Sequence, residues 1–268
     1  SLYLYLSGRS KPVSLVFALL AFFTYEMTLV LPALMLLTDI FFRNPTLSHK
    51  NMYLKSVVGY WLLALFYLFT RFFIVDTASR ADYYVSFYHT VLLMVKAFGL
   101  YVLLTVAPLD LSVVHRLPPG VYTYVHVGLD ELVLKTQSLF DLWIIGCTGL
   151  LVLIAATAWV YRIKWPVISY SIIWFFLSLA PVSNILPQST VLAERYLYTA
   201  SIGYCILLAH IVVGARGKWK NNTPYIAFAV LVLVFIVLTA GRVKDYGNDY
   251  TLWSQTVQSV PGSALARN

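Results

Sequence analysis

Residues 139–160 read LFDLWIIGCTGLLVLIAATAWV and carry one charged side chain, that of Asp141. A helix needs about 20 mostly apolar residues to cross the hydrocarbon core of a bilayer, and this stretch has that length. Six further stretches of the same character lie along the chain, at 13–42, 57–73, 88–107, 165–181, 196–213 and 224–241. The pattern predicts an all-α, polytopic bundle of about seven transmembrane segments.

The composition supports this interpretation, because 60% of the 268 residues are hydrophobic and the mean hydropathy is +0.78. Only 11% are charged, against roughly 25% in a soluble domain. Such a chain cannot cover a water-facing surface with polar groups, which excludes a soluble enzyme, a disordered tail and a disulfide-rich secreted module. The net charge of +8 comes mostly from Lys and Arg in loops between apolar stretches. We therefore expect the lipid bilayer, and no nucleic acid, as a partner.

Two short loops predict the orientation of the bundle in the membrane. The loops at 161–164 and 214–223 contain Lys and Arg and no acidic residue. Because such loops remain on the cytoplasmic side, both are expected there. The segments 108–138, 182–195 and 242–268 then face outward.

The N-terminal half leaves two alternatives open. Stretch 43–56 is basic and free of acids, yet single crossings by every apolar stretch would place it outside. Either 13–42 is two short membrane segments broken near Glu26 and Pro32, or 88–107 does not fully span. Lys96, in the middle of 88–107, favours the second alternative, since a charge at the centre of a membrane helix costs about 2.5–3.5 kcal/mol.

The main candidate for a binding site is PVSNILPQSTVLAERYLYTASIGYC, at 181–205. Its prolines end one helix, and Glu194 and Arg195 then stand at the start of the next. The planar fork of a guanidinium group matches phosphate oxygens, so Arg195 is a candidate for binding an anionic lipid head group. The alternative is an ordinary Glu–Arg pair that caps a helix at the membrane boundary.

Other charged residues could join this site. Glu26 lies in an apolar run, where a carboxylate suggests function; a helix break that brings it to the interface is the alternative. Arg71 closes the stretch 57–73, and by itself it could be an interface arginine whose head reaches water. Asp110 and His115 could act as acid, base or metal ligand, or belong to a polar loop. Isolated charges facing lipid are costly, so we expect Glu26, Arg71 and Arg195 to line one outward-opening cavity.

The tail differs from the rest of the chain. Residues 248–268 read NDYTLWSQTVQSVPGSALARN, and their apolar members, among them Trp253, recur at helical spacing. We therefore divide the chain into a membrane domain at 1–245 and an outward-facing helical junction at 246–268.

The chain resembles the C-terminal part of the membrane region of the transmembrane and tetratricopeptide-repeat-containing proteins, which are GT-C-class glycosyltransferases related to protein O-mannosyltransferases. Four motifs carry the resemblance, in chain order YEMTLVLPALMLLTD, APLDLSVVH, PVSNILP and AERYLYTASIGYC. Where the family has a Lys before the glutamate of the first motif, this chain has Tyr25. Trp253 and Pro261 match the junction that leads into the repeats, which are expected beyond this chain.

The resemblance implies a GT-C-like bundle that transfers a sugar from a polyprenyl-phosphate donor to a protein or glycan acceptor on the extracytoplasmic face. Arg195 and Arg71 would bind the donor phosphate. Five other side chains are expected to line the same cavity: Glu26, Glu194, Tyr196, Asn184 and His115. The family's catalytic carboxylate lies in the first outer loop, so the acid or base is expected upstream of Ser1. Some GT-C enzymes use a divalent metal, which is an expectation for the full-length parent alone.

Two other function classes remain as alternatives at this point. An O-antigen polymerase or ligase also has many helices and a large outer loop rich in Arg and His. A non-enzymatic transporter or scaffold would show inverted repeats, and the sequence shows no such symmetry. We expect an integral, multi-pass protein, in a bacterial inner membrane rather than in the endoplasmic reticulum.

Overall fold

The computed structural model describes residues 1–8, 10–42, 50–74, 86–109, 111–113, 115–117, 121–122, 138–185, 190–216 and 222–259. The α-helices are α1 (Leu2–Ser7), α2 (Lys11–Thr24), α3 (Leu31–Phe42), α4 (Lys50–Phe69), α5 (Phe87–Val106), α7 (Leu142–Tyr161), α8 (Pro166–Leu179), α9 (Leu197–Arg216), α10 (Thr223–Asp245) and α11 (Asp249–Ser259). Shorter helical turns are η1 (Glu26–Val30), η3 (Thr70–Ile74), η4 (Ala180–Val182) and η5 (Glu194–Tyr196). The strands β1 (Arg116–Leu117) and β2 (Val121–Tyr122) pair antiparallel.

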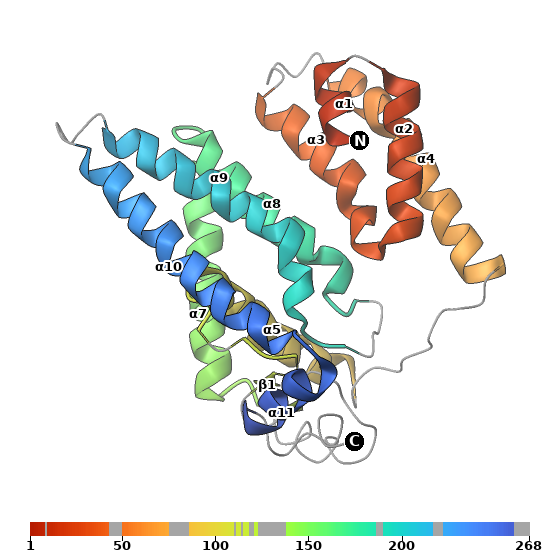
Figure 1. The fold of residues 1–268 in the computed structure, drawn as a ribbon. Coiled ribbons are helices and arrows are strands. Elements are labelled where there is room, and N and C mark those ends of the chain that lie inside the picture. Colours follow the sequence, from red (N-terminus) through yellow and green to blue (C-terminus); the bar gives the residue numbers. More distant parts are fainter. Residues whose placement is uncertain are drawn as a thin grey trace.

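This architecture confirms an all-α membrane bundle (Figure 1). Four of the described helices are long and apolar enough to cross a bilayer: α5, α7, α10, and η5 with α9 as one unit. Three shorter apolar helices accompany them, namely α2, the part of α4 from Val57 to Phe69, and α8 with η4. The total of about seven spans stays a prediction, because length and composition alone do not show which helices cross.

The stretch 13–42 is not one segment. Helix α2 ends at Thr24, and Tyr25 has an extended backbone with φ −155° and ψ 124°. A 3-10 turn and helix α3 follow, with Pro32 in the first turn of α3, where a missing N–H costs little. Both α2 and α3 pack on α4. The structure therefore takes the first of the two alternatives, in which 13–42 is broken near Glu26.

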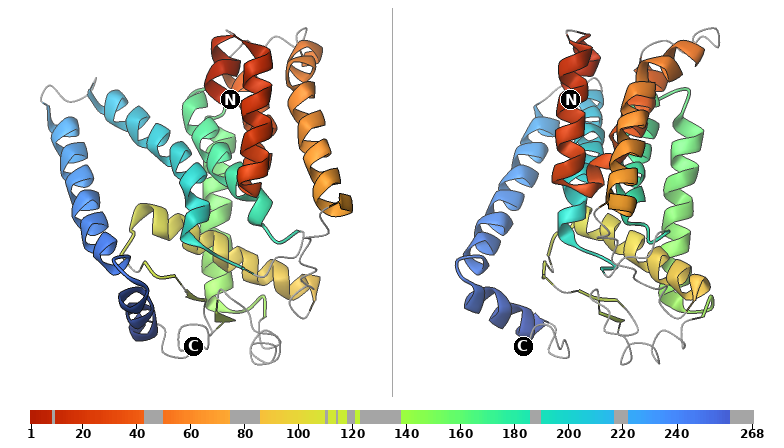
Figure 2. Two further views of the ribbon diagram at one scale, coloured as in Figure 1. Left: turned by 45° about the vertical axis from the view of Figure 1, so that its right-hand side comes forward. Right: turned by 90° about the vertical axis from the view of Figure 1, so that its right-hand side faces the viewer.

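Because of this break, the basic stretches lie at the same end of the bundle. The last turn of α3, the start of α4, the α7–α8 turn and the adjoining ends of α9 and α10 all lie at one end of the bundle (Figures 1 and 2). We call this the basic end, and the opposite end, where η1, η3 and η5 lie, the site end. The helix ends that flank 43–49 and 217–221 thus share a side with the loop at 161–164. The positive-inside rule is satisfied by all three at once.

Helix α5 crosses the other long helices obliquely at the site end (Figure 2). Its central Lys96 is 2% exposed and donates a hydrogen bond of 2.7 Å to Asp141 Oδ2. The other Asp141 oxygen accepts from the backbone N–H of Trp143 and caps α7. The charge in the middle of 88–107 is therefore paired inside the protein and does not face lipid. The alternative that 88–107 does not fully span stays a prediction.

Among the described helices, α8 and α9 share the most extensive contact. A Cβ atom added at Gly203 of α9 would lie 2.6 Å from the carbonyl oxygen of Ser171 in α8. Only a glycine permits this approach of the two backbones. The main core cluster lies where these two helices meet α5, with Leu93, Tyr101 and Leu179 fully buried.

The orientation leads to a labelling prediction. Tyr250 in α11, at the site end, is 83% exposed, and Lys164 in the α7–α8 turn is also exposed. In a variant with both native cysteines replaced by serine, we expect a membrane-impermeant maleimide to modify Tyr250→Cys from outside. Lys164→Cys should react only from the cytoplasmic side of sealed vesicles. Reaction of Lys164→Cys from outside would reverse the orientation. The sequence predicts that residues near Gln188 face outward and that Lys218 faces the cytoplasm. Both positions lie outside the described ranges.

Candidate functional site

The break after α2 and the end of α4 are joined by an ion pair. Arg71 in η3 lies with its Nη2 2.6 Å from Glu26 Oε1, and its Nη1 donates to the Tyr67 hydroxyl at 2.9 Å. The side chains of Arg71 and Glu26 are 27% and 51% exposed. Glu26 is thus held at a helix end and reaches solvent; it does not sit within a continuous membrane helix, as stretch 13–42 suggested. The sequence predicted that Glu26 and Arg71 line one cavity, but it did not predict that they form an ion pair.

Glu194 joins two segments that are far apart in the sequence. Its Oε1 accepts hydrogen bonds from the backbone N–H of Ser112, at 2.6 Å, and from Nε2 of His115, at 2.9 Å. The side chain of His115 is 8% exposed and that of Glu194 is 23% exposed. The carboxylate therefore fixes the loop that follows α5 against the start of α9. Asp110, in the same loop, lies outside the described residues.

The remaining contacts place Arg195 beside the Glu26–Arg71 pair. Arg195 is exposed, its guanidinium carbon lies 5.2 Å from the ring centroid of Tyr196, and its charge acts on the nearby Tyr25 side chain. Tyr25 immediately precedes Glu26, so Arg195 and Arg71 interact with neighbouring residues of one turn at the site end. A cationic group near a tyrosine face is also stabilised by the ring. Tyr25, noted in the sequence only as the residue in place of a family lysine, was not expected at the site.

A buried tyrosine of α5 fixes the backbone at the start of η5. Tyr101 in α5 is fully buried, and its hydroxyl accepts a hydrogen bond of 3.2 Å from the backbone N–H of Ala193. Tyr196 is 7% exposed and packs in the same core cluster. Glu194 and Arg195 therefore extend from a backbone that is fixed on both sides, which preorganises their side chains.

Asn184 differs from the other expected site residues. It has a positive φ of 52° and is 2% exposed. Its Nδ2 donates a hydrogen bond of 3.2 Å to Met94 Sδ, and it lines a small pocket against α5. Among the described residues no group of three or more His, Cys, Asp and Glu side chains could hold a metal ion.

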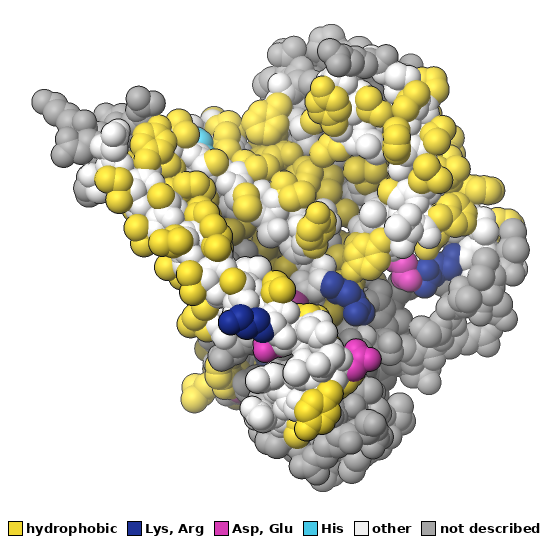
Figure 3. Space-filling view, in the orientation of Figure 1, with side chains coloured by type: hydrophobic (Ala, Val, Ile, Leu, Met, Phe, Trp, Pro, Cys, Tyr) yellow, Lys and Arg dark blue, Asp and Glu magenta, His cyan; other side chains and the backbone are white. Residues whose placement is uncertain are grey.

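The charged side chains of the site lie below a hydrophobic surface. In Figure 3, the Lys, Arg, Asp and Glu side chains drawn in colour gather along the site end, and the helices above them are covered by hydrophobic groups. Two guanidinium groups at such a boundary can bind an oxyanion that approaches from the membrane surface.

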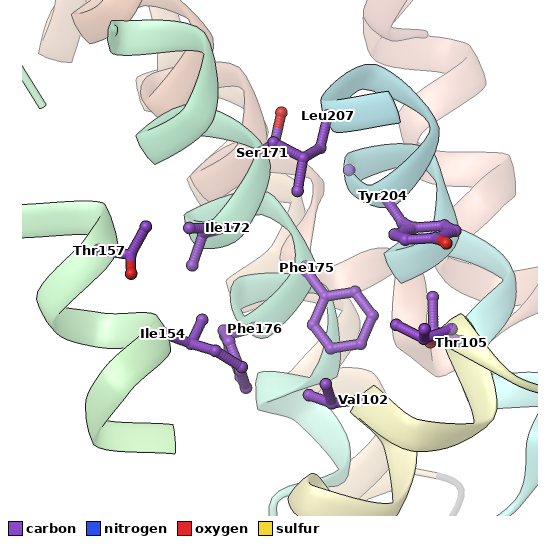
Figure 4. A pocket seen from close by; sticks show the side chains of 12 residues that line it. Val102, Thr105, Ile154, Thr157, Ser171, Ile172, Phe175, Phe176, Tyr204 and Leu207 are labelled. Atoms are coloured by element: carbon purple, nitrogen blue, oxygen red, sulfur yellow. The ribbon is translucent and has the colours of Figure 1, made fainter. Parts of the chain in front are cut away.

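A mostly apolar pocket lies deeper in the bundle, between α5, α7, α8 and α9 (Figure 4). Its volume is about 280 Å³. Its walls are formed by Val102, Thr105, Val106, Ile154, Thr157, Ser171, Ile172, Phe175, Phe176, Gly203, Tyr204 and Leu207. Gly203 follows Arg195 by about two helical turns, or about 12 Å along the axis of α9. The pocket thus lies at the depth of lipid chains if Arg195 lies at the level of head groups.

Comparisons with known proteins bear on the family resemblance of the chain. No model of a known protein family matches the chain, and no solved structure matches it. Protein O-mannosyl-transferase Tmtc3 of Drosophila melanogaster is 35% identical over 89 residues, which are 31% of this chain. Protein O-mannosyl-transferase TMTC3 of Homo sapiens is 31% identical over 91 residues, and that of Mus musculus is 30% identical over 90, each 33% of this chain. This chain is similar to part of animal O-mannosyl-transferases.

The similarity has a limited extent. Each alignment covers 10% of the relative's length, so it supports the family resemblance loosely and does not place this chain within the parent protein. The relatives correct one expectation. They are animal proteins, and animal cells have no bacterial inner membrane, so the preference for that membrane was wrong. Of the two membranes considered, the relatives favour the endoplasmic reticulum.

Proposed function

We propose that this chain is part of a membrane O-mannosyltransferase that moves mannose from a polyprenyl-phosphate donor to a hydroxyl group of a protein or glycan, on the luminal face of the endoplasmic reticulum. The observation that carries the proposal is the meeting of Arg71, Arg195, Glu26 and Tyr25 at one end of an apolar bundle. A phosphate attached to a lipid must lie at this boundary, with its charge near water and its chain in the membrane.

The two arginines would act on the phosphate group of the donor. In the transfer, the acceptor oxygen bonds to the anomeric carbon of mannose, and the bond from that carbon to the phosphate oxygen breaks. The phosphate leaves with the electron pair, while the proton of the acceptor goes to a base that we place outside this chain. Because negative charge grows on the leaving phosphate, a fixed guanidinium group stabilises the transition state more than the ground state.

The acidic residues would keep these cations in position. Glu26 holds Arg71 at 2.6 Å, and Glu194 fixes the loop with Ser112 and His115 next to Arg195. Each carboxylate also lowers the net positive charge of the site, which favours release of the charged lipid product. Their role in the proposal is therefore to orient the arginines and to limit the attraction of the site for phosphate.

The apolar pocket would hold part of the polyprenyl chain. In Figure 4, Phe175, Ile154 and Val102 face one space between the helices. We expect Ile154→Trp to fill part of this space and raise KM for a long-chain mannosyl donor on the order of tenfold, with kcat unchanged, because tenfold in affinity is about 1.4 kcal/mol of lost contact. A short-chain donor should be unaffected. The measurement is transfer by the full-length protein with both donors.

The matched control is Val152→Trp, because Val152 is on the same helix, is 60% exposed and does not line the pocket. It should leave KM for both donors unchanged. If Ile154→Trp raised KM for the long and the short donor equally, the polyprenyl chain would not bind in this pocket. If neither polyprenyl donor supported transfer by the wild type, the proposed donor class would be wrong.

A further inference from the structure

A second basic position lies away from the proposed donor site, in the corner between α10 and α11. Arg242 stands in the last turn of α10, and its Nη1 donates to Asp245 Oδ2 at 2.9 Å. The guanidinium carbon lies 5.2 Å from the ring centroid of Tyr246, and the side chain of Arg242 is 16% exposed. One edge of the guanidinium group is therefore paired with a carboxylate.

The other edge is buried and unpaired. Nε and Nη2 of Arg242 have no hydrogen-bond partner in the part of the chain that the structure describes, and neither atom is exposed. These two N–H groups point in parallel and form the edge with which arginine binds two oxygens of one carboxylate or phosphate. Buried donors of a charged group are rarely left without an acceptor, because their desolvation is then not compensated. The edge has the geometry of an empty oxyanion site.

The neighbouring groups of this corner are already engaged. The Asp245 carbonyl accepts from the Thr251 hydroxyl at 3.1 Å, and Asn248 caps α11 through the Thr251 backbone N–H at 2.7 Å. The carbonyls of Val243 and Lys244 accept from the turn that follows α10. Within the described residues these groups leave no acceptor for Nε and Nη2, which suits an acceptor brought by another molecule.

The surroundings of α10 indicate which molecule carries that acceptor. Helix α10 has 23 residues, is apolar enough to cross a bilayer, and has no buried residue. Lipid chains must surround such a helix, and its last turn then lies at the level of the lipid head groups. Figure 3 shows Lys or Arg side chains at this level, where the hydrophobic surface of α10 ends. A phosphate group is the oxyanion found at that depth.

We propose that the Nε–Nη2 edge of Arg242 binds the phosphate group of a membrane lipid, at a site separate from Arg71 and Arg195. Because both N–H groups are covered, entry of the phosphate must displace side chains at the α10–α11 corner. Lipid binding is thereby coupled to the position of α11, the first helix of the outward-facing tail. The proposal does not depend on the transferase function.

The test is the thermal unfolding midpoint of the chain in dodecyl maltoside micelles, which contain no phosphate. Phosphatidic acid, added to about 100-fold above its dissociation constant, should raise the midpoint by about 5 °C. Diacylglycerol has the same chains without the phosphate and should give no such shift. Inorganic phosphate separates the sources: an equal shift would assign the site to free phosphate, and no shift would assign it to the lipid.

Variants locate the effect. Arg242→Gln should lose the shift, and Arg242→Lys should keep less than half of it, because an ammonium group lacks the two-donor edge. The control is Arg162→Gln at the basic end, where the exposed Arg162 stacks 3.5 Å over the Trp159 ring; it should keep the full shift. If Arg242→Gln does not fold, Arg242→Lys provides the test. A full shift in Arg242→Lys would contradict binding by the two-donor edge of the guanidinium group. A full shift in Arg242→Gln, an equal shift with diacylglycerol, or no shift in the wild type with either phosphate probe would overturn the proposal.

Discussion

Replacement of Arg195 by alanine in the full-length protein is expected to lower the rate of mannose transfer by about 10²–10³-fold. Arg195 is exposed at the site end, and the contacts of Tyr25 and Tyr196 hold its side chain in place. A group that is positioned before the reaction needs no reorganisation as charge develops on the phosphate, and its removal is felt mainly in the transition state. The measurement is the transfer rate per folded molecule.

Two further variants distinguish this role from a structural one. Arg195→Lys should restore only part of the rate, because a lysine ammonium cannot donate two parallel hydrogen bonds. Arg162→Ala, at the opposite end of the bundle, should leave the rate unchanged. A purely structural Arg195 would give an alanine variant that is poorly folded and a lysine variant that is fully active. Unchanged turnover in folded Arg195→Ala would remove this residue from the donor site.

The second large effect is expected on stability, at the pair of Lys96 and Asp141. Asp141→Ser keeps an oxygen that can cap α7 but removes the charge that faces the buried Lys96 ammonium. Removal of one partner of a buried ion pair is strongly destabilising, by about 3–5 kcal/mol. We expect about 3 kcal/mol, the low end of that range, because the Asp141 side chain is 22% exposed and water reaches it. The measurement is the free energy of unfolding by SDS titration in mixed micelles.

The double variant Lys96→Met/Asp141→Ser serves as the control. It leaves no buried charge, so most of the lost stability should return. If the double variant were as unstable as Asp141→Ser, the loss would come from the cap or from packing and not from the ion pair.

The pair also predicts how stability depends on pH. The hydrogen bond from Lys96 is the main cause that holds the pKa of Asp141 below its ordinary value of 3.8. A carboxyl group with a lowered pKa contributes stability that is fully present above the unfolded value and is lost as the pH falls through the folded one. The wild type should therefore lose stability below about pH 4, and this part of the loss should be absent in the double variant.

Hydropathy predicted the helices of this chain well but missed how they connect. Each of the seven apolar stretches contains helix, because a run of that length without charges has few other solutions in a bilayer. The break at Tyr25 was weighed only as an alternative, since an extended residue between two apolar helices leaves the mean hydropathy unchanged. The sequence signal that favoured the break was the need to place all the basic stretches on one side of the membrane. The cost of burying the Lys96 charge favoured the other alternative, an incomplete span at 88–107.

The candidate site was predicted in its parts and not in its contacts. The charges of Glu26, Arg71 and Arg195 stood out because they interrupt or end apolar runs. The bond of Glu194 to His115 could not be derived, because these residues are 79 positions apart and no periodicity connects them. Tyr25 had no signal of its own, since a tyrosine near the end of an apolar helix is common at membrane interfaces.

The close approach at Gly203 has a consequence for how this protein could change over evolution. Because a side chain at Gly203 would push the α8 and α9 backbones apart, this point of the pocket wall cannot be narrowed without moving a helix. The opposite wall, which α5 and α7 supply, carries residues such as Val102 and Ile154 that can exchange for larger or smaller ones. Homologues adapted to lipids of different length or saturation should therefore vary at pocket side chains such as those of α5 and α7, while the glycine persists. A library randomised at those two helices would sample new lipid preferences without disturbing the frame that holds Arg195.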